Sequence, residues 1–366
     1  MSSSLFSPLT LRGVAFANRI MVAPMCQYSA VDGTVGDWHL MHLGQFAISG
    51  AGLVMVEATG VEAIGRITPD CVGLYSDQNE AALDRVIRFC RDHGDAKYGI
   101  QLGHAGRKGS TVAPWRGGGP IEPDQGPWAP PAPSAVPYLP NWETPVALDE
   151  KGLARVRQAF VDAAKRARRI GFELVELHMA HGYLLHQFLS PLSNRRNDAY
   201  GGNLDGRMRF PLEVFEAVRA VWPRERPLII RVSATDWADG GWDLEQTITF
   251  AGEIKAIGCD AIHVTSGGLV QDQKIEVGPG YQTHFAAEIR RRVEIPTIAV
   301  GQITEAVQAE TIVKTGQADM VAMARGLLYD PRWVWKAAAT LGAEATFPPQ
   351  YARANPAMRG QPFVKR

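Results

Sequence analysis

The sequence lacks several features that would assign the chain to a specialised class of protein. Its 366 residues contain only four cysteines, at Cys26, Cys71, Cys90 and Cys259, and none of them forms a C-x-x-C pair. We therefore expect neither a disulfide framework nor a zinc or iron–sulfur site, and we expect a reducing, cytoplasmic setting. Lysine plus arginine and aspartate plus glutamate number 38 each, so the charge indicates neither nucleic acid nor an acidic membrane as a partner.

Long apolar runs are also missing. None approaches the ~20 residues that a membrane-spanning helix needs, and Met1 to Leu11 shows no basic-then-apolar signal pattern. No G-x-G-x-x-G motif follows any strand-like segment, which disfavours a dinucleotide-binding Rossmann domain. The chain is 46% hydrophobic and 21% charged, and it is long enough for one large α/β domain or two ordinary ones.

Eight apolar, strand-like segments alternate with helical patterns along the chain. The predicted strands span residues 19–23, 53–58, 98–102, 174–178, 228–232, 261–265, 297–300 and 320–323. Parallel strands need crossover helices, and eight such units close a barrel. We therefore predict an α/β fold, a (β/α)8 TIM barrel formed by one domain of residues 1–366, with a doubly wound sheet as the alternative.

Three segments lie outside this repeat. Leu9 to Phe16 predicts a short hairpin, which we expect to plug the closed end of the barrel. From Thr111 to Leu148 proline, glycine and tryptophan dominate, which predicts a long loop after the third strand that packs as a lid. A proline-rich tail of about residues 343–366 closes the chain.

Three hydrogen-bonding rings follow the fourth predicted strand, at His178, His181 and Tyr183. In a parallel α/β protein this edge of the sheet carries the chemistry. Paired imidazoles can bind an anionic or carbonyl oxygen while a nearby phenol delivers a proton. They could instead hold a metal ion, or both histidines could be structural and bonded to backbone carbonyls.

The other strand ends would open into the same mouth. They contribute Pro24, Met25, Cys26, Tyr28, Ala58, Gln101, His104, Arg231, Ser266-Gly267-Gly268, Gly301-Gln302 and Ala324-Arg325-Gly326. Backbone amides that small glycines leave accessible, together with an arginine, predict a phosphate site after the seventh and eighth strands. Arg231 lies in an otherwise apolar strand and needs a buried acceptor, either Glu176 or the edge of a bound ring. Gln101 could hydrogen-bond the amide edge of such a ring.

Taken together, these motifs resemble the Old Yellow Enzyme family. The resemblance rests on Pro24-Met25-Cys26-Gln27-Tyr28, on His104 to Lys108, on His178-x-x-His181-x-Tyr183 with its continuation to Gly202, and on Arg325-Gly326. The cysteine after Pro-Met and the closing Gln350-Tyr351-x-Arg353 are similar to the thermophilic-like, xenobiotic-reductase branch. The likeness covers nearly the whole chain.

The resemblance implies non-covalent FMN at the barrel mouth, NADPH or NADH as hydride donor, and reduction of the C=C bond of α,β-unsaturated carbonyl or nitro compounds. His178 and His181 would hold the substrate oxygen, Tyr183 would protonate the α-carbon, and Cys26 would tune the flavin. The implied cofactor contacts are Ala23, Pro24, Met25, Cys26, Ala58, Gln101, His178, Arg231, Gly267, Gly301, Gln302, Ala324 and Arg325. Ala23 stands where some relatives have serine, so its side chain offers no hydrogen bond to the flavin.

On the substrate side, the resemblance implies contacts from Tyr28, His178, His181, Tyr183 and Arg353. Arg353 would reach the active site of a neighbouring subunit, so that a homodimer or homotetramer is expected. Two alternatives fit the residues alone: a metal-dependent barrel lyase or hydrolase using His178 and His181, and a non-catalytic binder of flavin or phosphate. A metal site would need carboxylates at other strand ends, and none stands at the third, fifth, sixth or eighth.

Overall fold

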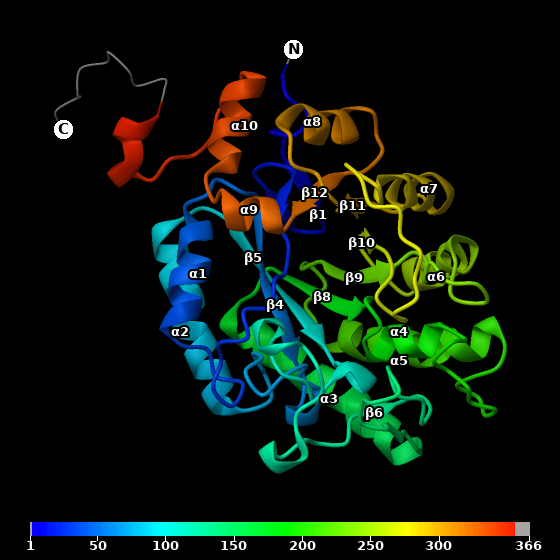
Figure 1. Cartoon of the computed structure of the whole chain (residues 1–366). Coiled ribbons are helices and arrows are strands. Elements are labelled where there is room, and N and C mark those ends of the chain that lie inside the picture. Colours follow the sequence, from blue (N-terminus) through cyan, green and yellow to red (C-terminus); the bar gives the residue numbers. More distant parts are fainter. Residues whose placement is uncertain (1, 356–366) are drawn as a thin grey trace.

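The computed structural model of the chain describes residues 2–355. Its centre is a closed barrel of eight parallel strands, which confirms the predicted (β/α)8 fold. The strands, in their order around the barrel, are β3 (Ile20–Val22), β4 (Leu53–Gly60), β5 (Lys97–Gly103), β8 (Leu174–Met179), β9 (Leu228–Ser233), β10 (Ile262–Thr265), β11 (Thr297–Ala299) and β12 (Met320–Met323). Figure 1 shows helices surrounding this barrel.

The helices that follow the strands were mostly predicted. They are α1 (Asp37–Ala47), α2 (Asp77–His93), α3 (Glu150–Ile170), α5 (Leu204–Val221), α6 (Leu244–Ala256), α7 (Thr283–Val293), α8 (Ala306–Lys314) and α10 (Trp333–Leu341). Two more helices, α4 (Leu184–Leu189) and α9 (Arg325–Tyr329), occupy segments for which no helix was predicted. With six and five residues they are too short to show a helical repeat in the sequence.

The N-terminal hairpin closes one end of the barrel, as predicted. It consists of β1 (Leu9–Leu11) and β2 (Val14–Phe16), paired antiparallel. Leu11, Val14 and Phe16 form one buried cluster with the inward-facing side chains of the barrel's lower half. Burial of these apolar side chains removes them from water and fixes the hairpin in place.

The barrel interior changes from apolar to polar towards the carboxyl ends of the strands. Along β8 the inward-facing residues are Leu174, Glu176 and His178, and the first of them belongs to the plugged apolar cluster. His178 is in register with Arg231 on β9. Polar groups are therefore concentrated at the open end, where the loops after the strands meet.

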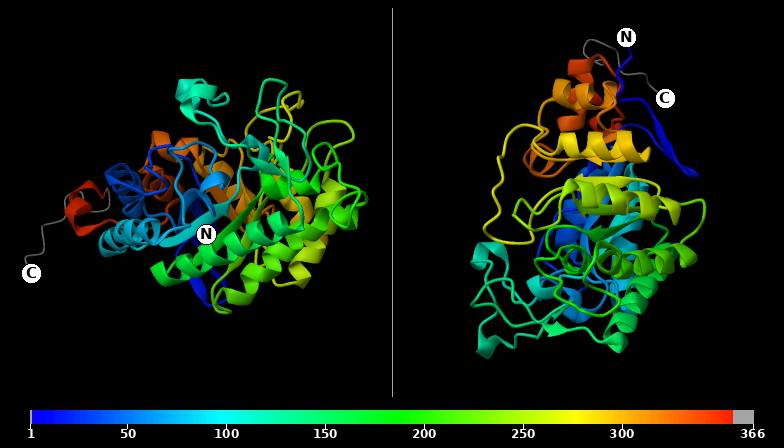
Figure 2. Two further views of the ribbon diagram at one scale, coloured as in Figure 1. Left: turned by 90° about the horizontal axis from the view of Figure 1, so that it is seen from below. Right: turned by 90° about the vertical axis from the view of Figure 1, so that its right-hand side faces the viewer.

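The segment predicted as a lid lies at this open end (Figure 2). Its short elements are η3 (Pro114–Arg116), η4 (Pro123–Gln125), β6 (Pro131–Ala132) and β7 (Val146–Ala147). The indole of Trp128 donates to the Ile64 carbonyl at 3.0 Å, so the segment is packed as predicted. Figure 2 shows the teal lid and the dark-blue hairpin at opposite ends of the barrel.

The C-terminal segment lies beside α1 and α10. It ends in η5 (Pro349–Ala354), and Phe347 stacks on Trp335 of α10 with ring centroids 4.3 Å apart. A surface groove of about 910 Å³ runs between α1, α2 and this segment, away from the barrel mouth. Residues 356–366 of the predicted tail fall outside the described part of the chain. Within residues 2–355 the structure contains no helix of the length and apolarity needed to cross a membrane.

Candidate active site

The three rings predicted from the sequence do lie together. The His178 ring is 5.1 Å from that of His181 and 4.8 Å from that of Tyr183, measured between centroids, and both contacts are edge-on. The chain reverses between β8 and α4 through left-handed conformations at His181 (φ +57°) and Gly182 (φ +72°). This turn brings side chains from residues 178, 181 and 183 to one point at the barrel mouth.

Both histidines are neutral donors. Burial, followed by the nearby Arg231 guanidinium, lowers the pKa of His178 and of His181 well below the ordinary value. Nδ1 of His178 accepts from the Ala180 amide at 3.2 Å, so the ring proton is carried by Nε2. His181 Nε2 lies 3.1 Å from the Thr265 hydroxyl, which orients that ring. Nε2–H of His178 can therefore donate to an oxygen without carrying charge, and His181 can do so through Nδ1 in the tautomer in which the Thr265 hydroxyl donates to Nε2.

Tyr183 keeps its proton. Burial, followed by the neighbouring Cys26 and Tyr28, raises the pKa of its phenol well above the ordinary value. The ammonium of Lys108 lies 5.4 Å from the centre of the Tyr183 ring. A cation on a ring face favours the negative charge that would remain after proton transfer.

A buried polar layer forms the floor beneath these rings. Gln101 Nε2 donates to Glu176 at 2.6 Å, and His263 Nδ1 lies 2.9 Å from the other oxygen of the same carboxylate. Glu176 is therefore engaged by Gln101 and His263 and makes no direct bond to Arg231 in the described chain, contrary to one of the two sequence expectations.

Arg231 is the clearest sign of a ligand site. Its side chain is buried, at 8% exposure, and within residues 2–355 its Nε has no hydrogen-bond partner. Burial lowers the pKa of the guanidinium, while Glu176 acts in the opposite direction. An unpaired buried donor is costly, so this position fits an acceptor on a bound ring, which was the second expectation.

The loops after β11 and β12 suit a phosphate group. Gly301 (φ +126°) and Gln302 (φ +47°) adopt left-handed conformations. The amides of Gly301, Gln302 and Ala324 make no hydrogen bond to other residues of the described chain. Free backbone N–H groups of this kind bind anions, so the predicted phosphate contacts, with Arg325 next to Ala324, fit FMN.

The remaining residues that were predicted to contact the cofactor lie on or directly after β3 and β4, the first two strands of the barrel. Ala23 is buried at the end of β3 and leads into Pro24, Met25 and Cys26. Burial, followed by Glu57, raises the pKa of the Cys26 thiol, so it is not a thiolate at neutral pH. On β4, a bulge between Val56 and Ala58 places Ala58 opposite Gln101.

Tyr28 connects the first strand to the lid. Its backbone is left-handed (φ +46°), and its ring meets that of Trp115 edge-on at 5.7 Å. Trp115 itself is 65% exposed. Arg353 lies in η5, in the C-terminal segment where Tyr351 contacts Trp335, and within one chain it is not brought to the three rings.

Sequence reasoning missed two polar side chains of the mouth. His263 and Thr265 face inward on β10, and period-two alternation along that strand could have identified both. For Lys108 the sequence indicates only that it belongs to the His104 to Lys108 motif and assigns it no contact. Its Nζ donates to the carbonyls of His181 and Gly268, at 2.9 Å each, and no local pattern predicts contacts over such sequence distances.

Relatives match nearly the whole chain. A sequence model of the NADH:flavin oxidoreductase / NADH oxidase family matches residues 4–344. The chain is 43% identical over 359 residues to an NADPH dehydrogenase of Geobacillus sp. (strain WCH70), covering 96% of this chain and 99% of that one. It is 45% identical over 354 residues to an NADPH dehydrogenase of Listeria innocua serovar 6a, with 96% and 99% covered.

Solved structures share the fold. Morphinone reductase superposes with a TM-score of 0.77 at 29% identity, covering 96% of this chain and 93% of that one. A structure of morphinone reductase in complex with tetrahydroNAD gives a TM-score of 0.75 at 28% identity, covering 95% and 93%. An old yellow enzyme homologue from Zymomonas mobilis gives 0.75 at 25% identity, covering 94% of each chain.

Proposed function

Because the chain belongs to the NADH:flavin oxidoreductase / NADH oxidase family, we propose that its barrel mouth reduces the C=C bond of α,β-unsaturated carbonyl or nitro compounds. The chain is an NAD(P)H oxidoreductase that uses FMN, as the resemblance to the Old Yellow Enzyme family implied. The observation that carries the finer proposal is the convergence of two neutral imidazoles and a protonated phenol at one point of the mouth.

The cofactor would lie across the polar floor. Arg231 and Gln101 would bond the polar edge of its ring, and the amides of Gly301, Gln302 and Ala324, with Arg325, would hold its phosphate. The other proposed ring contacts are His178, Ala23, Pro24, Met25, Cys26, Ala58 and Gly267. When bound, FMN accepts hydride from NAD(P)H and supplies it to the β-carbon of the alkene.

The histidines and the tyrosine would complete the reduction. Nε2–H of His178 and a ring nitrogen of His181 would donate to the carbonyl or nitro oxygen, where negative charge develops as hydride arrives. Tyr183 would give its proton to the α-carbon. The Lys108 ammonium would stabilise the phenolate that remains.

A second subunit would complete the substrate side. Trp38, Met41 and Phe89 on α1 and α2 are between 40% and 51% exposed, and the last two line the groove beside the C-terminal segment. Contiguous exposed apolar side chains mark interaction surfaces. We propose that a homodimer or homotetramer covers them and that Arg353 reaches the neighbouring mouth beside Tyr28.

The alternatives from the sequence have less support. The relatives are flavin oxidoreductases, not metal-dependent lyases or hydrolases. Over residues 2–355 no group of three or more histidine, cysteine, aspartate or glutamate side chains is arranged to hold a metal ion. A non-catalytic flavin binder would not need two neutral imidazoles and a protonated phenol at one point.

Replacement of both clamp histidines tests the proposal. In a His178→Ala, His181→Ala variant we expect NADPH-dependent reduction of cyclohexenone or maleimide to fall about a hundredfold or more, because oxygen stabilisation is lost. The protein should stay yellow. A His93→Ala, His284→Ala variant, changed at two exposed positions on α2 and α7, is the control. Unchanged alkene turnover in the first variant would refute the proposed clamp.

Tyr183→Phe isolates the proton donor. We expect alkene reduction by the reduced enzyme to slow about a hundredfold, since general acid catalysis is typically of that size or larger. Flavin reduction by NAD(P)H should change little, because no proton from Tyr183 is needed there. Stopped-flow measurement of the two half-reactions separates them, and equal slowing of both would count against the assignment.

A further inference from the structure

Side chains bond the central amides and carbonyls of the turn between β8 and α4, two of them from distant parts of the chain and two from α4 itself. Its four central polar groups are bonded as follows: the His181 amide to Ser233 Oγ (3.0 Å), the His181 carbonyl to Lys108 Nζ (2.9 Å), the Gly182 amide to His186 Nδ1 (2.9 Å) and the Gly182 carbonyl to Gln187 Nε2 (2.7 Å). Because this turn carries His181 and precedes Tyr183, its conformation sets where both rings point.

The turn has one backbone hydrogen bond of its own, from the Tyr183 amide to the Ala180 carbonyl at 3.1 Å, but its backbone conformation is unfavourable. His181 is left-handed (φ +57°), a conformation that side chains other than glycine rarely adopt. Such a conformation persists only when its surroundings enforce it. The side chains that bond its amides and carbonyls are therefore part of what makes the site.

Of these side chains, His186 is the one whose bonding depends on a proton position. It is fully buried, and its Nδ1 accepts the Gly182 N–H, so its single ring proton must be on Nε2. Nε2 lies 2.9 Å from Oδ1 of Asp236, which is also fully buried; the contact is close but bent from the direction of the ring N–H, and neither atom has another partner within residues 2–355. A neighbour that only accepts hydrogen bonds holds the proton on Nε2.

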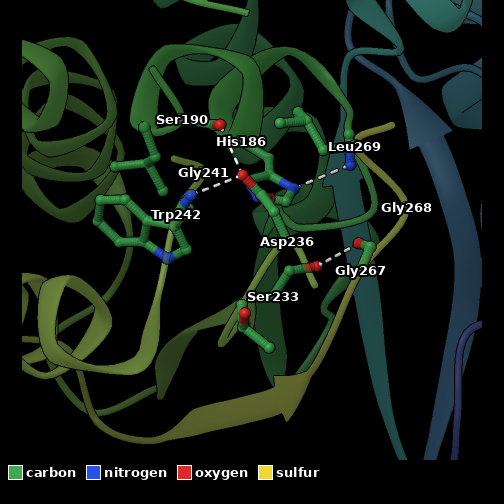
Figure 3. A network of polar contacts seen from close by, with 12 residues as sticks. His186, Ser190, Ser233, Asp236, Gly241, Trp242, Gly267, Gly268 and Leu269 are labelled. Atoms are coloured by element: carbon green, nitrogen blue, oxygen red, sulfur yellow. Dashed lines mark hydrogen bonds and ion pairs between the residues drawn. The ribbon is translucent and has the colours of Figure 1, made fainter. Parts of the chain in front are cut away.

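Asp236 is such an acceptor. Its other oxygen, Oδ2, accepts from the Ser190 hydroxyl at 2.6 Å and from the Trp242 amide at 2.7 Å, as Figure 3 shows. Burial by itself opposes ionisation of this carboxyl, but His186 and these donors outweigh it, and the pKa of Asp236 lies below its ordinary value. The carboxylate connects α4 to the loop after β9.

We propose that Asp236 and His186 are positioning residues for the reaction: Asp236 fixes the tautomer of His186, and His186 thereby holds the Gly182 amide and the turn that orients His181 and Tyr183. The proposal rests on the function proposed above for those two rings. Neither Asp236 nor His186 touches the substrate or the cofactor in this account, so both act only through the turn.

Asp236→Asn tests the tautomer directly. The new amide must keep its oxygen towards Ser190 and Trp242, which both donate, so its NH2 group faces His186 Nε2. The histidine then has to accept at Nε2 and carry its proton on Nδ1, where it meets the N–H of Gly182. A change of one atom is thus expected to turn a hydrogen bond at Gly182 into a clash of two donors.

Two further variants separate this effect from a general loss of stability. Ser190→Ala removes a buried hydrogen bond from Asp236 but leaves the carboxylate, and therefore the tautomer, in place. His186→Asn, combined with Asp236→Asn, puts a side-chain oxygen near the former Nδ1 position, where it can accept from Gly182 whatever stands at position 236. The first variant is the control and the second is the rescue.

Binding of 4-hydroxybenzaldehyde to the FMN-loaded enzyme is the functional readout. We expect Asp236→Asn to weaken binding about tenfold or more, Ser190→Ala to weaken it less than about threefold, and the double variant to recover most of the loss. Equal weakening by Asp236→Asn and Ser190→Ala, or no recovery in the double variant, would overturn the proposal.

Nitrogen NMR of 15N-histidine-labelled protein gives a second readout that does not depend on the proposed function. The proton of His186 should move from Nε2 to Nδ1 in Asp236→Asn and stay on Nε2 in Ser190→Ala. A proton that stays on Nε2 in both variants would also overturn the proposal. If the unmodified enzyme fails to bind the phenol, the histidine clamp is wrong, and the NMR result still decides the tautomer.

Discussion

At the scale of single residues, Gly182 shows how closely the turns of the site approach each other. A Cβ at this position would lie 2.3 Å from the carbonyl oxygen of Gly268, a backbone atom that also accepts from Lys108 Nζ. Gly202 has nearly the same left-handed conformation (φ +73°) but faces open space. The two glycines therefore differ in packing and not in backbone conformation.

Because of this difference in packing, we expect the two glycine-to-alanine substitutions to lower the free energy of unfolding by different amounts. Gly202→Ala should lower the free energy of unfolding by about 1 kcal/mol, the cost of a left-handed alanine. Gly182→Ala should cost a further ~1–3 kcal/mol, because the overpacked turn must move away from Gly268. Urea unfolding of both variants measures the two free energies of unfolding. Equal losses would show that the turn at Gly182 can accommodate a Cβ beside Gly268 without strain.

At Arg231, in contrast, we expect a substitution that does not lower the stability of the FMN-free protein. Because its Nε is buried without a partner in the described chain, Arg231→Met should leave the FMN-free protein at least as stable as before. The same change should weaken FMN binding about ten- to a hundredfold, the value of a buried, charge-assisted hydrogen bond. Thermal unfolding with and without FMN measures both effects. A destabilised apoprotein with unchanged FMN affinity would assign Arg231 a structural role.

The sequence predicted the residues of the site better than their contacts. His178, His181 and Tyr183 stand within six positions at a strand end, so local spacing is enough to group them. Glu176 could not be assigned by the same logic. It is bonded to Gln101 and His263, residues 75 and 87 positions away, and only the closed barrel decides that they, and not Arg231, are its direct partners.

At the scale of elements, one buried side chain links the lid to the loop after β10. Arg107, 3% exposed, donates to the carbonyls of Val136 and Pro137 in the lid and of Leu269 in the loop after β10. Burial lowers the pKa of this guanidinium to about 10, so it remains charged at neutral pH. The N–H donors of its guanidinium thus connect the lid to the loop at the rim of the mouth.

Arg107→Ala should release this part of the lid. We expect amide hydrogen exchange in residues 134–142 to become about tenfold faster, since a buried multidentate contact is lost. Arg116→Ala is the matched control in the same lid, because Arg116 is exposed and only faces Asp70 at 3.7 Å. Similar exchange in both variants would show that the lid is held by other contacts.

Elements with a clear repeat were predicted well, and elements without one were not. Ser76 and Asp149, which are of residue types that favour helix N-caps, accept from the amides of Asn79 and Gly152 at the starts of α2 and α3. The short helices α4 and α9 follow strands directly and form because the barrel rim orients them. Their few residues carry no periodic signal that could be recognised beforehand.

At the scale of the whole molecule, buried neutral histidines make stability depend on pH. The pKa of His42 is lowered to about 4, mainly by burial, and those of His178, His181 and His263 are lowered as well. In the unfolded chain each would titrate near its ordinary value of about 6.5. Below that pH the unfolded state binds more protons than the folded state and is favoured.

We therefore expect the free energy of unfolding to be constant well above roughly pH 6.5 and to fall as the pH drops towards about 4, the folded pKa of His42. Urea midpoints at roughly pH 7.5, 6 and 5 would show the decline before most carboxylates titrate. A free energy of unfolding that rises as the pH is lowered over this range would mean that the histidines are protonated in the folded protein. A His42→Gln variant should reduce the slope.

The architecture followed from the sequence because each βα unit carries its own pattern of apolar residues and caps. The pairing of distant side chains did not, since it depends on how the folded barrel brings neighbouring strand ends and loops together. This explains why the barrel, the hairpin plug and the strand-end rings were predictable, whereas the contacts of Lys108, His186 and Asp236 emerged only in three dimensions.

The visible absorption spectrum of the purified protein, recorded while a phenol is added, tests whether His178 and His181 hold an oxygen beside bound FMN. We predict flavin bands and, on addition of 4-hydroxybenzaldehyde, a new long-wavelength band as the phenolate oxygen is held by His178 and His181 over the flavin. The band should be absent from the His178→Ala, His181→Ala variant. A protein that is colourless and cannot be reconstituted with FMN, or a double variant that still gives the band, would contradict the account.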